Sequence, residues 1–109
     1  MNKNLVLKLR YVGMLARIGH REYGFHVEDK DRRVRQVILT IDNTVFRTRQ
    51  LLFQEAPDLC YQKLLSDLDN ETVDAPIRRR AQVTEADVAA YRLSHPTARL
   101  RKAASVRSQ

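Results

Sequence analysis

Residues 23–41 read YGFHVEDKDRRVRQVILTI and decide the fold. Two runs of alternating apolar residues flank a polar turn in this stretch. The first run is Tyr23, Phe25 and Val27, and the second is Val37, Leu39 and Ile41. Strict alternation gives each strand one apolar face, and the β-branched and aromatic side chains suit a pleated surface. The turn from Glu28 to Arg32 contains no glycine, so a tight two-residue primed turn is not expected. The stretch therefore predicts an antiparallel hairpin.

A lone hairpin is only marginally stable in water, so further elements must cover it. Upstream, residues 5–18 also alternate in part and are closed by Gly19, which predicts one or two more strands. Downstream, a covering helix is expected from Pro57 to Leu68, because proline fits a first helical position and Asp58 places negative charge in the first turn. Its apolar stripe consists of Cys60, Tyr61, Leu64, Leu65 and Leu68, and Asn70 is the expected stop. We expect an α+β fold with an antiparallel sheet of about three strands covered by this helix.

Three other segments complete the predicted organisation. The period of residues 44–55 fits a short strand and a short helix equally, so that segment stays open. Residues 71–83 contain Pro76 and few large apolar side chains, which is typical of a linker. Thr84 is the expected N-cap of a second helix, Glu85 to Ser94, whose scattered apolar side chains predict weak docking or docking only in a complex. The predicted divisions are a core domain over 1–70, a linker over 71–83, and a C-terminal helix with a basic tail over 84–109.

The composition is that of one small globular domain. The chain has 109 residues, of which 43% are hydrophobic and 30% charged, enough for one ordinary core. Its single cysteine, Cys60, cannot form an internal disulfide, which indicates a reducing, cytoplasmic setting. No apolar run approaches the roughly 18–20 residues needed to cross a bilayer, so no membrane association is expected.

Positive charge is the feature of the sequence that points to a function. The formal net charge is +7 and the pI is near 10.1, above the value of about 9 at which nucleic-acid binding deserves consideration. Arginine suits phosphate because its planar fork donates two parallel hydrogen bonds. We therefore favour a non-catalytic protein that binds DNA or RNA through its linker and tail, with little sequence preference. The candidate residues are Arg78, Arg79, Arg80, Arg99, Arg101 and Lys102. The alternative is that these charges only solvate the surface.

A second basic set lies on the hairpin and after it, and consists of Arg32, Arg33, Arg35, Arg47 and Arg49. Three aspartates are interleaved with these residues, so local ion pairing is the role expected for the set. Tyr23 and Phe25 could stack bases, but their place on the apolar strand face favours core packing.

Motifs of catalysis are missing from the sequence. It has no glycine-rich phosphate loop, no nucleophile elbow and no recurrent spacing of metal ligands among its histidines and Cys60. We expect no enzymatic activity, no cofactor, no metal and no small-molecule substrate. The alternative to nucleic-acid binding is a protein-interaction or self-association module, because an unpaired sheet edge can accept a strand from a partner or from a second copy.

Overall fold

A computed structural model describes residues 6–96, with side chains from residue 8 onward. The predicted hairpin is confirmed: β2 (His20–Asp29) and β3 (Val34–Asp42) pair antiparallel, with Tyr23 opposite Leu39 and Phe25 opposite Val37. The Asp29 carboxylate accepts hydrogen bonds from the backbone N–H groups of Asp31 and Arg33, at 2.9 and 3.0 Å. These bonds shape a turn that lacks glycine, and Arg32 takes the left-handed conformation in it, with φ 65°.

The α+β class is confirmed, and the sheet has one strand more than the three expected. Its order is β1-β2-β3-β4, in which β1 (Val6–Ala16) is antiparallel to β2 and β4 (Arg80–Gln82) is parallel to β3. The sheet is therefore mixed. The short β4 lies in the segment expected as a linker, and it is held by backbone hydrogen bonds from Ile38 N–H to Arg79 and from Val83 N–H to Thr40.

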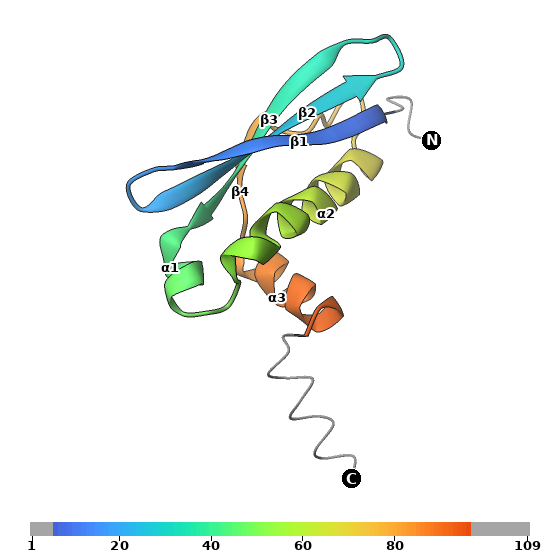
Figure 1. The fold of residues 1–109 in the computed structure, drawn as a ribbon. Coiled ribbons are helices and arrows are strands. Elements are labelled where there is room, and N and C mark those ends of the chain that lie inside the picture. Colours follow the sequence, from blue (N-terminus) through green and yellow to red (C-terminus); the bar gives the residue numbers. More distant parts are fainter. Residues whose placement is uncertain (1–5, 97–109) are drawn as a thin grey trace.

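One face of the sheet is covered by α2 (Ala56–Asp69), close to the predicted helix (Figure 1). Alternate side chains of β2 and β3 meet the buried face of this helix in the core. The core members from these three elements are Tyr23, Phe25, Val27, Val37, Leu39, Ile41, Ala56, Leu59, Cys60, Leu64 and Leu68. Tyr61 and Leu65 of the predicted stripe are only half-buried. Among the described residues, no helix is long and apolar enough to cross a membrane.

Residues 44–55, for which the sequence fitted a strand and a helix equally, are helical at both ends. Asp42 caps α1 (Asn43–Arg47) by accepting a hydrogen bond from Thr44 N–H at 2.8 Å. After a loop anchored by buried Leu51, the short 3₁₀ helix η1 (Phe53–Glu55) leads directly into α2. In Figure 1, α1 lies at one end of the sheet and the turn between β2 and β3 lies at the other.

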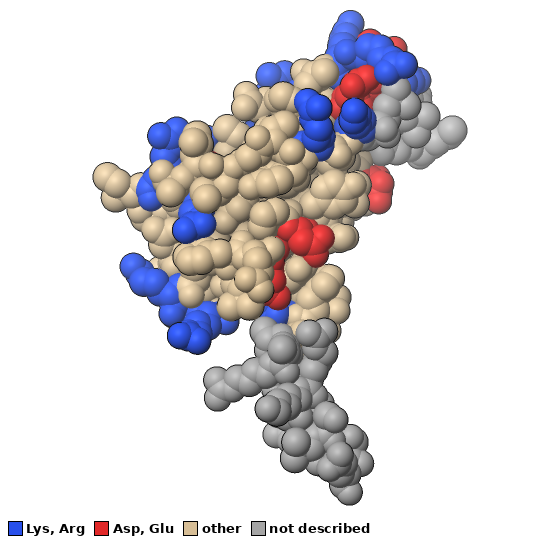
Figure 2. All heavy atoms as spheres, in the orientation of Figure 1, with Lys and Arg blue, Asp and Glu red and all other residues tan. Residues whose placement is uncertain are grey.

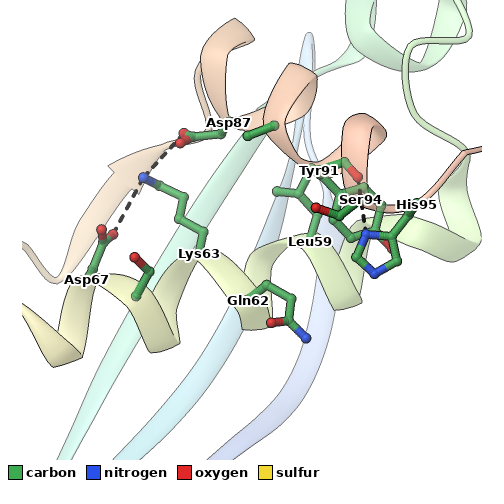
Figure 3. Close-up of a pocket in the computed structure, with 10 residues that line it drawn as sticks. Leu59, Gln62, Lys63, Asp67, Asp87, Tyr91, Ser94 and His95 are labelled. Carbon is green, nitrogen blue, oxygen red and sulfur yellow. Dashed lines mark hydrogen bonds and ion pairs between the residues drawn. The ribbon is translucent and has the colours of Figure 1, made fainter.

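The second predicted helix, α3, spans Glu85–Ser94 as expected, with Thr84 as its N-cap and Asp87 completing a capping box. It packs against α2 through buried Val88 and Tyr91 and through several polar contacts. The Tyr91 hydroxyl donates to Asp58 at 2.8 Å, and Arg92 forms two hydrogen bonds with the Glu55 carboxylate. Lys63 lies between Asp67 and Asp87, at 3.5 and 3.2 Å (Figure 3). The pocket shown in Figure 3 is therefore the groove between the packed helices α2 and α3.

A buried ion pair ties the segment after α2 to the sheet. Arg35 on β3 donates two hydrogen bonds to the Glu71 carboxylate, at 2.7 and 3.0 Å, and Ile77 N–H donates a third at 2.9 Å. Glu71 is 2% exposed. A buried carboxylate is tolerated only when its oxygens are paired in this way, so the start of the expected linker is fixed to the core.

Candidate nucleic-acid interface

Ion pairing divides the basic residues into two groups. Six described Lys and Arg side chains contact a carboxylate: Arg17, Arg32, Arg35, Lys63, Arg80 and Arg92. The other nine have no carboxylate partner within the described part of the chain: Lys8, Arg10, Arg21, Lys30, Arg33, Arg47, Arg49, Arg78 and Arg79. The expectation of local ion pairing for the second basic set is therefore right for Arg32 and Arg35. Arg33, Arg47 and Arg49 form no ion pair among the described residues, and the charge of Arg47 acts on Asp42 only at longer range. A cation without a carboxylate partner keeps its charge available to an anionic ligand.

The arginines proposed from the sequence have different environments. Arg78 and Arg79 are exposed, whereas the Arg80 guanidinium contacts the Glu22 carboxylate. The remaining three candidates, Arg99, Arg101 and Lys102, lie outside the described residues, as does the rest of the predicted tail.

Glu22 is the centre of a polar cluster on the helix-free face of the sheet. Besides Arg80, its carboxylate lies 3.4 Å from both Arg17 Nε and His20 Nε2, and the residue is 8% exposed. The hydrogen bond from Arg80 is the main cause of a lowered pKa of Glu22, and those from His20 and Arg17 act in the same direction. The carboxylate therefore stays ionised and links the β1–β2 turn to β4, which commits Arg80 to the fold.

Arginine and phenylalanine side chains gather at the α1 end of the molecule. A hollow of about 290 Å³, here named the α1 pocket, is lined by Ala16, Arg17, Arg21, Asn43, Phe46, Arg47 and Phe53. No carboxylate is among these lining residues. Figure 2 shows Lys and Arg atoms over the end of the molecule where Figure 1 places α1. The pocket thus joins positive charge to aromatic surface.

Arg21, Phe46 and Phe53 form a cluster of planar groups in the pocket wall. The Arg21 guanidinium carbon lies 3.8 Å from the centre of the Phe53 ring and 5.5 Å from that of Phe46. The two rings lie 4.8 Å apart and are tilted by 39°. Arg21 is therefore held in place by cation–π contacts rather than by a carboxylate, and Phe53 remains 57% exposed.

Local backbone geometry explains why these groups meet. Arg21 faces the helix side of the sheet beside Ile41, close to where β3 passes into α1. At the end of α1, Gln50 N–H donates to the Val45 carbonyl and Arg49 N–H to the Phe46 carbonyl, both at 3.0 Å. This is the Schellman pattern, in which Arg49 (φ 59°) occupies the left-handed position usually filled by glycine. The sharp turn returns the chain so that Phe53 lies against Phe46.

The sequence offered a partial signal for this pocket. Arg47 and Arg49 stand between Phe46 and Phe53, and alternation of basic and aromatic residues is typical of nucleic-acid surfaces. Arg21 carried no such signal, because its neighbours are strand residues whose pattern indicates only sheet formation. The placement of Tyr23 and Phe25 in the core is confirmed.

Cys60 and the possible metal ligands are further candidate chemical groups in residues 6–96. Cys60 is fully buried, and burial raises its pKa to about 12, so its thiol is not a ready nucleophile. Within residues 6–96, no three His, Cys, Asp or Glu side chains are grouped so that they could hold a metal ion. The absence of enzymatic activity stays a prediction.

Comparisons of the chain with protein-family models, with curated proteins and with solved structures found no match. The α1 pocket must therefore be interpreted from its own chemistry.

Proposed function

We propose that this protein is a non-catalytic nucleic-acid binder with little sequence preference, and that the α1 pocket is its main contact surface. One observation carries the proposal: arginines, the exposed ring of Phe53 and the partly buried ring of Phe46 line a pocket that has no carboxylate among its lining residues. Arg47 donates to Thr44 Oγ1 at 3.1 Å through a single Nη2, so its other N–H groups stay available for phosphate. Arg49 extends the positive surface beyond the pocket. Phosphate contacts of this kind position a strand without reading its sequence.

The arginines expected from the sequence have a secondary place in this proposal. Arg78, Arg79, Arg99, Arg101 and Lys102 add long-range attraction for a polyanion. Arg80 contributes less, because the Glu22 carboxylate already occupies its guanidinium.

The proposal is tested by fluorescence anisotropy with mixed-sequence DNA and RNA across a salt series from about 50 to 200 mM. If about three phosphates are neutralised, affinity should fall by roughly 20- to 40-fold over this range, because each contact releases condensed counterions. Absence of binding at the lowest salt concentration would contradict the proposal.

A matched variant of the full chain separates the pocket from the C-terminal region. Replacement of Arg99, Arg101 and Lys102 by alanine should leave most of the binding in place. Complete loss of nucleic-acid binding in this variant would indicate that the binding site lies in residues 97–109. Deleting residues 71–109 is unsuitable as a test, because it would remove β4, the Glu71 carboxylate and the buried side chains of α3.

The exposed edge of β1 favours a second candidate function, the binding of a partner strand. β1 pairs only with β2 among the described strands, and Tyr11, Val12, Met14 and Leu15 are exposed along it. A register shift between Tyr11 and Gly13 interrupts the ladder with β2, and because bulges discourage pairing at an edge, this candidate ranks second. Sedimentation velocity of the wild type and of Leu15→Glu tests self-association. A wild-type monomer at all concentrations would exclude pairing between copies.

A further inference from the structure

We infer that the α1 pocket receives one unstacked nucleobase, so that the protein prefers single strands to duplexes. This inference rests on the proposed function and names the ligand of its site. Bases in a duplex are stacked on both faces, whereas a single strand can turn a base outward onto an aromatic or guanidinium plane.

The wall of the pocket already has the geometry of a stacking platform. The Arg21 guanidinium carbon lies 3.8 Å from the centre of the Phe53 ring, and the Phe46 ring lies against the same ring from α1. Even with these two neighbours, Phe53 keeps 57% of its surface exposed. A base can extend this stack by covering apolar surface that is otherwise in contact with water.

The size and polar lining of the pocket also fit a single base. Its volume of about 290 Å³ is close to the lower limit of roughly 300 Å³ for small-molecule sites. Asn43 lines the pocket, and its side-chain amide has no hydrogen-bond partner within residues 6–96. Its backbone N–H donates to the Gly19 carbonyl at 2.9 Å, and its side-chain amide is able to donate to and accept from a base edge.

Charge flanks this platform where a strand would carry its phosphates. Arg47 lines the pocket from α1 and forms no ion pair among the described residues, whereas Arg17 lines it from the β1–β2 turn and already donates through Nε to Glu22 at 3.4 Å. In this arrangement Arg47 is the main phosphate ligand beside the base, and Arg17 can contribute only through its Nη groups. An acidic peptide would satisfy the arginines but would leave the exposed ring of Phe53 unused.

The test uses the full chain, anisotropy at one low salt concentration, and three probes of equal length. The probes are a mixed-sequence single strand, its duplex, and a single strand in which every base is replaced by an abasic sugar. We expect the wild type to bind the mixed single strand about 5- to 150-fold more tightly than the abasic strand, the range of stacking contributions for one base. Unlabelled polyglutamate, as an acidic competitor without bases, should displace the single strand poorly.

Variants of Phe53 test whether the base-dependent part of the binding comes from stacking on the Phe53 ring. Phe53→Leu should weaken binding of the mixed single strand by roughly 5- to 30-fold and leave abasic-strand binding unchanged, whereas Phe53→Tyr should retain wild-type affinity. Leu93→Ala is the control, since Leu93 is an exposed apolar residue on α3. Equal, salt-dependent binding of mixed and abasic strands by the wild type would overturn this inference and leave the phosphate-binding proposal standing. No binding of any strand would overturn both, and strong competition by polyglutamate would indicate a protein ligand instead.

Discussion

Replacing Arg35 with alanine is expected to lower the free energy of unfolding by about 3–5 kcal/mol, the usual cost of removing one partner from a buried ion pair. The Glu71 side chain is fully buried, and Arg35 supplies two of its three hydrogen bonds. Without Arg35, the carboxylate keeps its desolvation cost and retains only the bond from Ile77 N–H. The segment between α2 and β4 loses its anchor at the same time.

Urea denaturation followed by circular dichroism measures this effect, and Arg32→Ala is its matched control. Arg32 lies on the same hairpin and pairs with Glu28, but its side chain is 80% exposed. An exposed pair contributes at most about 1 kcal/mol. A similar small loss for both variants would show that the pair between Arg35 and Glu71 does not stabilise the fold as its burial indicates.

The pH dependence of the same pair has a definite sign. Burial raises the pKa of Glu71, but the hydrogen bonds from Arg35 and Ile77 lower it more, so its pKa is below the ordinary value of 4.5. The stabilisation is therefore fully present above about pH 4.5 and is lost as pH falls through the lower, folded-state pKa. The difference in stability between wild type and Arg35→Ala should accordingly shrink in acid.

Reversing the charge of Arg47 and Arg49 together is expected to weaken nucleic-acid binding by about 100-fold at low salt, or roughly 1.4 kcal/mol for each site. Each substitution by glutamate removes a phosphate contact and adds repulsion. Neither arginine has a carboxylate partner among the described residues, so no ion pair of the fold is broken.

The control for this variant is Lys30→Glu with Arg33→Glu, at the opposite end of the sheet. Both residues are exposed and have no described carboxylate partner, and both double variants change the net charge from +7 to +3. We expect the control to lose less than about 10-fold, because only the long-range field changes. Equal losses, measured by anisotropy at one salt concentration, would show that binding depends on net charge and not on the α1 pocket.

Elements with a local sequence pattern could be predicted, and those made by distant residues could not. The hairpin, α2 and α3 each carry alternation, a helical stripe or a cap within a dozen or so residues. β4 is only three residues long and forms because Ile38 and Thr40 offer backbone groups to it. Arg35 and Glu71 are 36 positions apart in the sequence. No local sequence periodicity could therefore predict that they pair.

The basic residues of the candidate site could be identified in the sequence, but their grouping in one pocket could not. The excess of arginine indicated an anionic ligand, but the α1 pocket combines residues from the β1–β2 turn, β2, α1 and η1. Basic side chains that look equivalent in the sequence differ in the fold, since Arg80 contacts Glu22 while Arg47 has no carboxylate partner among residues 6–96. Only the tertiary structure shows which of these basic side chains is paired with a carboxylate.

The most direct test of the account is a titration of ¹⁵N-labelled full-length protein with a short mixed-sequence single strand, followed by two-dimensional NMR. We predict that the earliest amide shifts fall on residues 16–21 and 43–53, which form the α1 pocket and its loop. Shifts confined to the β2–β3 turn or to residues 97–109, or no shifts at all, would contradict the central claim that the α1 pocket binds nucleic acid.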